Sequence, residues 1–181
     1  VNIDVLNKEN FFTLLRSSVK LTETLDMGLK ISNDYYHFEF FKKIIHIEIK
    51  RAKRYQIHLS LMYLTFDNVE IMKKEKSAKE FDLLFKNFTD KITTSIRDID
   101  IPITFGDEAI LILMPHTDKS GANIVAERIY NKLLKHHPQI QFSISIASSQ
   151  RDELSYSSLM EAIHEGIDES RSVGGNKIVV K

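Results

Sequence analysis

The chain has 181 residues, of which 43% are hydrophobic, and this suits one domain with a sizeable core plus an extra element. Lys and Arg number 25, as do Asp and Glu, so the formal net charge is zero and nothing global favours nucleic acid or an anionic membrane as a partner. The absence of cysteine excludes disulfide bonds and thiolate metal sites. No apolar run approaches the length of a membrane span, and the N-terminus carries no signal peptide. We therefore expect a cytoplasmic domain, or the cytoplasmic part of a longer, membrane-attached protein.

Residues 1–33 form the first predicted unit, an amphipathic helix ahead of the main domain. Its apolar face would be made by Phe12, Leu15, Val19, Leu25 and Leu29. Such a helix can pack on the domain or on its own copy in a homodimer, and it can also serve as a signalling linker from an upstream module. The sequence leaves these interpretations open.

Residues 34–181 form the second predicted unit, in which segments of helical period alternate with apolar strands. We expect helices over 38–52, 81–96, 122–133 and 159–167, and strands over 59–66, 101–105, 109–115, 141–147 and 179–180. Gly106-Asp107 is typical of a two-residue hairpin turn, and Gly174-Gly175 of a helix end. This order predicts an α/β (α+β) fold with a split βαβ core, parallel central strands and flanking helices.

The stretch from Arg97 to Pro115 carries the most informative spacing. It reads R-x-x-D, then five residues, then Gly106-Asp-Glu-Ala-Ile110, then an apolar strand that ends in proline. This stretch resembles the GGDEF family, whose members read R-x-x-D, five residues and G-G-(D/E)-E-F. Later family motifs fall into step with Ala126-Glu-Arg-Ile129, Ser143-Ile-Ser145 and Gly174-Gly-Asn-Lys-Ile178, so the resemblance covers about residues 34–181. It implies the palm-like central sheet of nucleotidyl cyclases.

The resemblance implies diguanylate cyclase chemistry, and the chain departs from the family at several of the positions concerned. Active members join two GTP molecules held by two domains, with metal ions supporting the phosphoryl transfer. Thr65 stands where the family has its first metal-binding Asp, and Ala109 stands at the fourth signature position, normally Glu. Gly106 keeps the first signature glycine, Asp107 replaces the second, and Glu108 keeps a metal-ligand carboxylate. With two carboxylates lost, we expect no catalytic residues and no cyclase activity.

A rival alignment shifts the signature by one residue, so that Phe105-Gly-Asp-Glu-Ala109 stands for G-G-D-E-F. It restores an acidic pair in Asp107 and Glu108, but it requires a one-residue deletion after Asp100. We prefer the ungapped alignment. The rival predicts a weakly active diguanylate cyclase that makes cyclic di-GMP from GTP with Mg²⁺.

The guanine-binding positions are also incomplete. The family's Asn falls on Lys73, whereas its Asp falls on Asp82 and would remain with Gly106 as a residual nucleotide site. Arg171, near the family's late phosphate-side Lys, is interpreted as a helix C-terminal charge. The seven histidines are scattered without metal spacing, so we expect no metal site and no required cofactor.

The resemblance implies one retained site, the family's inhibitory site for cyclic di-GMP. Its residues would be Arg97 and Asp100 of the R-x-x-D motif and Arg128 on the next helix. An Asp can accept hydrogen bonds from the edge of guanine, and an Arg can bind phosphate or guanine bidentately. Arg and Asp at this spacing also form plain ion pairs at helix ends.

Together these features predict a catalytically inactive GGDEF-type domain that acts as a cyclic di-GMP receptor. It would work as a homodimer or with an upstream or partner signalling protein. The alternatives are the weakly active cyclase and a purely structural dimerisation domain that binds no nucleotide.

Overall fold

A computed structural model of the chain describes residues 33–105, 108–149 and 155–181. The predicted N-terminal helix lies outside the described residues except for Asn33, as do Gly106 and Asp107 of the predicted hairpin turn. No helix in the described part is both long enough and apolar enough to cross a lipid bilayer.

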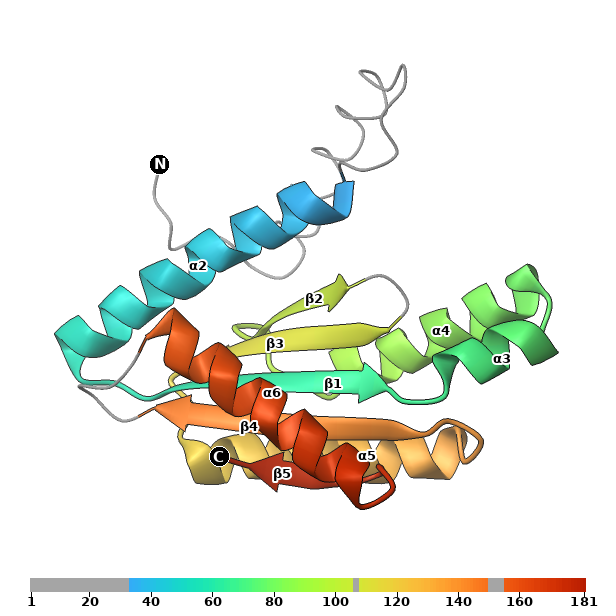
Figure 1. Ribbon diagram of the computed structural model, residues 1–181. Coiled ribbons are helices and arrows are strands. Elements are labelled where there is room, and N and C mark those ends of the chain that lie inside the picture. Colours follow the sequence, from blue (N-terminus) through green and yellow to red (C-terminus); the bar gives the residue numbers. More distant parts are fainter. Residues whose placement is uncertain (1–32, 106–107, 150–154) are drawn as a thin grey trace.

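A five-stranded sheet in the order β2-β3-β1-β4-β5 forms the middle layer of the domain (Figure 1). Its strands, in chain order, are β1 (Leu59–Phe66), β2 (Ile101–Phe105), β3 (Ala109–Pro115), β4 (Phe142–Ser149) and β5 (Ile178–Val180). β1 lies at the centre and runs antiparallel to both of its neighbours, β3 and β4. The short strand predicted at the C-terminal end is present as the edge strand β5, parallel to β4.

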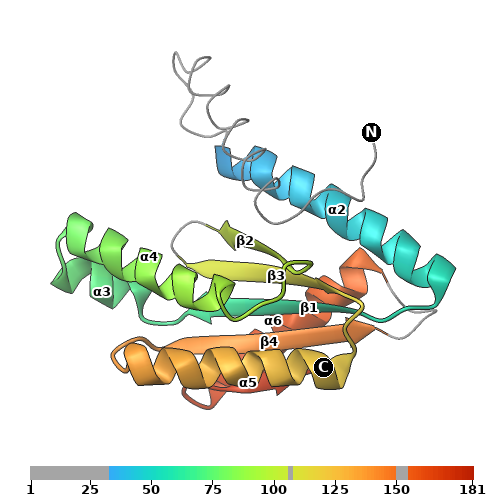
Figure 2. The same ribbon diagram turned by 180° about the vertical axis from the view of Figure 1, so that it is seen from behind.

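Helices in the described residues cover both faces of the sheet. In chain order they are α2 (Asn33–Tyr55), α3 (Val69–Glu75), α4 (Ala78–Thr93), α5 (Lys119–His136) and α6 (Tyr156–Ser172). The two opposite views show α2 and α6 on one face and α3, α4 and α5 on the other (Figures 1 and 2). Each face therefore has its own hydrophobic core.

The expectation of parallel central strands is wrong, although the split βαβ unit is present. β1 and β2 run in the same direction, but β3 enters between them and pairs antiparallel with both. β4 follows α5 and also runs antiparallel to β1. The relative directions of the strands depend on which strands become neighbours, and the apolar pattern of a single strand does not predict its neighbours.

The central strand is apolar on both sides because helices cover both. Seven of the eight residues of β1 are buried. Leu59 and Leu61 pack towards α2 and α6, whereas Met62, Leu64 and Phe66 pack towards α3, α4 and α5. Such a strand reads as a continuous apolar run rather than as an alternating one.

Side-chain caps determine where the helices that carry the candidate site begin. Ser77 and Glu80 form a capping box at α4, in which the Ser77 backbone N–H donates to Glu80 Oε2 over 2.9 Å. At α5, Asp118 Oδ1 accepts from the Gly121 N–H over 2.7 Å. α6 ends before Gly174 and Gly175, as predicted, and both have positive φ (100° and 74°).

Candidate functional site

A row of neutral residues crosses the central strands, and it includes Thr65 and Ala109, the two predicted positions of lost carboxylates. Thr65 of β1 lies opposite Ala109 of β3 on one side and opposite Ser143 of β4 on the other. All three residues are buried. Mg²⁺ is bound through hard oxygen ligands, usually including a carboxylate. This row offers it only two neutral hydroxyl groups.

The carboxylate that contacts this row is Asp67, and each of its oxygens is already hydrogen-bonded. Oδ1 accepts from Thr65 Oγ1 (3.1 Å) and from Arg171 Nε (2.9 Å). Oδ2 accepts from Ser143 Oγ (2.6 Å). The interpretation of Arg171 as only a helix C-terminal charge is therefore incomplete, because its guanidinium forms an ion pair with Asp67.

The turn after α6 closes over the same carboxylate. Ser170 Oγ donates to Ser143 Oγ over 2.9 Å, which ties the last turn of α6 to β4. A Cβ atom at Gly175 would lie 3.0 Å from Asp67 Oδ2 and would crowd this carboxylate, and the positive φ of 74° also favours glycine there. Within the described residues, no group of three His, Asp or Glu side chains could hold a metal ion.

Glu108 lies close enough to Tyr63 of β1 to act on its phenol electrostatically. Its side chain is exposed, and its carbonyl oxygen accepts from the Phe66 N–H over 2.8 Å. Burial raises the pKa of Tyr63, and of the charges that act on this phenol Arg171 lowers the pKa while Glu108 raises it. Gly106 and Asp107 lie outside the described residues, so the acidic pair of the rival alignment is not placed.

The guanine-side positions lie on α3 and α4, towards the other face of the sheet. Asp82 on α4 is exposed. Lys73 Nζ on α3 is 3.7 Å from Glu70 Oε1 and 5.6 Å from the centroid of the Phe81 ring. A lysine in an ion pair and over an aromatic ring does not reproduce the amide of the family's Asn.

The pocket between α3 and α4 is wholly apolar. It is lined by Phe66, Val69, Met72, Phe81, Leu84, Phe85, Phe88 and Ile140. Its free interior volume is about 10 Å³, roughly that of one water-sized probe. A purine does not fit this volume and would find no hydrogen-bond partner in the lining.

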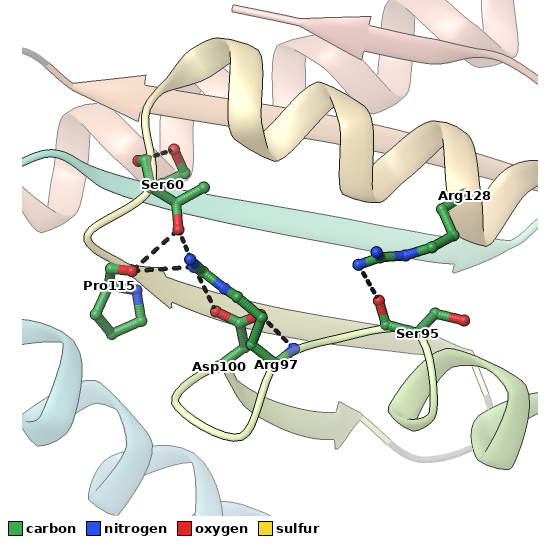
Figure 3. A network of polar contacts seen from close by, with 7 residues as sticks. Ser60, Ser95, Arg97, Asp100, Pro115 and Arg128 are labelled. Carbon is green, nitrogen blue, oxygen red and sulfur yellow. Dashed lines mark hydrogen bonds and ion pairs between the residues drawn. The ribbon is translucent and has the colours of Figure 1, made fainter.

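Arg97 and Asp100 contact each other directly at the start of the loop before β2 (Figure 3). Asp100 Oδ1 accepts from Arg97 Nη2 (3.0 Å), and Oδ2 accepts from the Arg97 backbone N–H (2.8 Å) and from Nε (3.4 Å). The Asp100 side chain is 0% exposed, whereas that of Arg97 is 44% exposed. The R-x-x-D motif thus forms the ion pair that its spacing allows, with the carboxylate inside and the guanidinium at the surface.

Further contacts hold the Arg97 guanidinium against the end of β3. Nη2 also donates to the Pro115 carbonyl (3.2 Å) and to Thr117 Oγ1. Ser60 Oγ donates to the Thr117 carbonyl over 2.7 Å, so the network reaches the first residues of β1. Arg97 is therefore a positioned side chain rather than a loosely held surface arginine.

Arg128 and Lys132 reach from α5 to the end of α4. Arg128 Nη2 donates to the Ser95 carbonyl over 2.5 Å, as Figure 3 shows. Lys132 Nζ, one helical turn later, donates to Thr94 Oγ1 (2.9 Å) and Ser95 Oγ (3.1 Å). Arg128 thus contacts the residue two positions before Arg97. No sequence motif pointed to Lys132, although its i, i+4 spacing from Arg128 places it on the same helix face.

Comparison with known proteins decides the family. The model of the family described as "Diguanylate cyclase, GGDEF domain" matches residues 37–177. The chain belongs to the GGDEF family. This GGDEF chain is 26% identical over 150 residues to the diguanylate cyclase DgcS of Shewanella oneidensis. The aligned stretch covers 81% of this chain and 49% of DgcS. It therefore spans about half the length of the curated relative that it matches.

Solved GGDEF structures share the fold. The active GGEEF domain of a diguanylate cyclase from Vibrio cholerae has a TM-score of 0.68 at 18% identity, over 74% of this chain and 89% of that one. The GGDEF domain of DgcB from Caulobacter crescentus in complex with c-di-GMP has a TM-score of 0.66 at 16% identity, over 77% of this chain and 87% of that one. These likenesses confirm the predicted palm-like α+β fold of the GGDEF domain.

Proposed function

We propose that this GGDEF domain is a cyclic di-GMP receptor without cyclase activity, and that it binds its ligand through Arg97 and Arg128. The observation that carries the proposal is a contrast between two places in the fold. At the end of the central strands two of the catalytic positions, Thr65 and Ala109, are neutral, whereas two positioned arginines are exposed at and beside the R-x-x-D motif.

The proposed lack of catalysis is supported by the missing carboxylates at the end of β1. Phosphoryl transfer between two nucleotides requires metal ions to bridge phosphate oxygens and to stabilise the developing charge. Thr65 and Ala109 supply no carboxylate. Asp67, the carboxylate in contact with this row, is compensated by the Arg171 guanidinium and by two hydroxyl donors.

The proposed ligand binding rests on the exposed guanidinium groups of the two arginines. Arg97 uses Nε and Nη2 within the protein, which leaves Nη1 for a phosphate or for the edge of a guanine. Arg128 is exposed on α5 and reaches the same loop. Asp100 acts in this proposal as a positioning residue, because its buried carboxylate holds Arg97 in place. Binding of this kind uses ion pairs and hydrogen bonds, so no metal or other cofactor is required.

Isothermal titration calorimetry of the full chain with cyclic di-GMP tests this proposal. The wild-type chain should bind with micromolar or tighter affinity. Arg97→Ala and Arg128→Ala should each weaken binding by about tenfold or more, which corresponds to about 1.4 kcal/mol. Arg54→Ala is the matched control, because Arg54 is exposed on α2 over the opposite face of the sheet. No heat from the wild-type chain at high protein concentration would overturn the proposal.

A weakly active cyclase is the rival that the unplaced acidic pair keeps open. Incubation with GTP and Mg²⁺ should give no cyclic di-GMP. Turnover that is lost in Glu108→Ala would overturn the proposal and establish an enzyme.

A purely structural domain is favoured by one observation, the Arg97–Asp100 pair with its buried carboxylate and its link through Thr117 to Ser60. In that case Arg97→Ala lowers stability, and neither GTP nor cyclic di-GMP changes the melting temperature of the wild-type chain. A homodimer, or a complex with an upstream signalling partner, forms part of either proposal.

A further inference from the structure

The helix α2 concentrates positive charge, although the chain as a whole is neutral. Between Glu39 and Tyr55 it carries six lysines and arginines and only two glutamates. Glu39 Oε1 lies 4.0 Å from Lys42 Nζ, and Glu48 Oε1 lies 2.8 Å from Arg51 Nη1. Two of the six cations are therefore paired on the helix itself, and the other four have no acidic partner within the described residues.

The side of α2 that points away from the sheet is both basic and apolar. Its outer stripe is formed by Phe40, Lys43, Ile47, Lys50 and Arg54, which are all exposed. Steps of three and four residues keep them on one side of the helix, opposite the side that packs in the core. Phe40 and Ile47 are 51% and 46% exposed, so the stripe interleaves three cations with two large apolar side chains.

Acidic residues are missing from the exposed surface of this helix. From residue 40 to residue 55, every exposed side chain of α2 is a lysine, an arginine, a histidine or an apolar residue. A helix side that only faces water usually mixes charges of both signs, whereas a basic amphipathic helix is typical of binding to a membrane surface. The composition of the outer stripe therefore indicates an anionic partner that also offers apolar contacts.

The acidic residues of the neighbouring helix α6 leave this stripe largely free. α6 contacts α2 at its first residue, Tyr156, and then runs over β4 towards the edge strand β5, whereas α2 lies over β1 and β3 (Figures 1 and 2). Near β5, Lys181 Nζ lies 2.8 Å from Glu169 Oε2 and also acts on Glu165. Glu161, five residues after Tyr156, is a single exposed acid against the four unpaired cations of α2.

We propose that the outer stripe of α2 binds this domain to the surface of an anionic lipid bilayer. The cations bind the negatively charged headgroups, and Phe40 and Ile47 enter the headgroup region. From residue 40 to residue 54 the stripe is about 21 Å long at 1.5 Å per residue, so the helix lies along the surface. The proposal rests neither on binding of cyclic di-GMP nor on the lack of catalysis.

Other occupants suit the outer stripe less well. The phosphates of a nucleic acid would attract its cations, but a duplex backbone offers no apolar surface to Phe40 and Ile47. A second α2 would place like charges together, which costs free energy. A lipid surface satisfies both the cations and the apolar side chains.

Binding to the bilayer should depend on charge and on salt. Each Lys or Arg near an anionic bilayer strengthens binding by about fivefold, so loss of two cations should weaken it by about 25-fold. The attraction is screened over about 8 Å at physiological ionic strength. Raising the salt from about 50 mM to about 500 mM should therefore weaken binding by about tenfold or more.

Cosedimentation of the full chain with lipid vesicles tests the proposal. The wild-type chain should bind vesicles of phosphatidylcholine with phosphatidylglycerol, and it should not bind vesicles of phosphatidylcholine alone. Lys50→Glu with Arg54→Glu should weaken binding by about 25-fold or more. The matched control, Lys79→Glu with Lys86→Glu, makes the same change of net charge at exposed positions of α4 on the other face and should leave binding unchanged.

A fluorescence experiment locates the contact, because the chain contains no tryptophan. The emission of Ile47→Trp should shift to the blue when vesicles containing phosphatidylglycerol are added. Leu83→Trp is the matched control, since Leu83 is 62% exposed on α4, and its emission should stay unchanged. Far-UV circular dichroism and melting curves confirm that each variant is folded.

A folded wild-type chain that does not bind the anionic vesicles overturns the proposal. Equal losses of binding in the two double variants also overturn it, because the effect would then come from net charge alone. A blue shift in Leu83→Trp but not in Ile47→Trp would place the contact on the other face, with the same consequence. Binding to a DNA duplex but not to vesicles, abolished by Lys50→Glu with Arg54→Glu, would assign the stripe to nucleic acid and overturn the proposal as well.

Discussion

Replacing Gly166 by alanine should strongly destabilise the domain, because α6 lies unusually close to β4 at this point. A Cβ atom at Gly166 would lie 2.1 Å from Ser145 Oγ, 3.0 Å from Ser145 Cβ and 3.4 Å from Val179 Cγ1. Ser145 is 0% exposed and cannot move aside into solvent. Overpacking of this kind costs about 1–3 kcal/mol, and a contact as short as this one belongs at the upper end.

The compensating change is Ser145→Gly, which removes the two closest of the three atoms that the new methyl group would meet. Ser145 stands where the family's S-I-G motif has glycine, and its buried hydroxyl has no hydrogen-bond partner within the described residues. The single variant Ser145→Gly should cost about 1 kcal/mol, since glycine loses backbone entropy in a strand. In the double variant most of the cost of Gly166→Ala should disappear, with a coupling free energy of about 1–3 kcal/mol.

Urea denaturation of the four proteins, followed by circular dichroism, gives these free energies of unfolding. The reasoning fails if Gly166→Ala is as stable as the wild-type chain. It also fails if Ser145→Gly leaves the cost of the alanine unchanged, because the clash with Ser145 would then not be its cause.

Two further predictions concern buried polar groups. Burial, and to a lesser degree His136 and Lys91, lowers the pKa of His137. Its neutral form therefore contributes stability above the unfolded pKa of about 6.5, and this contribution should fall as the pH drops through the lower folded pKa. His137→Leu should make the urea midpoint depend less steeply on pH across this range. An unchanged slope of midpoint against pH would contradict the prediction. Asp67→Ala should cost about 2 kcal/mol, because it leaves buried hydroxyl donors and the Arg171 guanidinium without their acceptor. Asp82→Ala, at an exposed position, is the control and should change the free energy of unfolding by less than about 0.5 kcal/mol. Equal losses of stability in Asp67→Ala and Asp82→Ala would show that the Asp67 contacts contribute nothing.

The helices and strands were predictable from local sequence because each pattern reports its own environment. The apolar period of residues 38–52 gave the buried side of α2, with Phe41, Ile45, Ile49 and Ala52. The glycine pair at the end of α6 was also predictable, since its positive φ values are those that glycine adopts most easily. α3 was less clear, because its charged second half, Met72 to Glu75, equally suits a solvated loop.

Contacts between distant residues were not predictable in the same way. Asp67 and Arg171 are 104 positions apart, and no local pattern states that the end of β1 meets the end of α6. The Arg97–Asp100 pair was foreseeable from its i, i+3 spacing, but not the burial of Asp100, which depends on packing against the end of β3.

Backbone amide chemical shifts, recorded while cyclic di-GMP is added to the isotope-labelled chain, test the receptor proposal most directly because they also locate the ligand. We expect saturable shifts gathered at residues 95–100 and around Arg128 and Lys132, with little change at Thr65 and Asp67. Shifts that gather instead at the end of β1 and at Glu108, or no shifts at all, would contradict a retained site at the R-x-x-D motif.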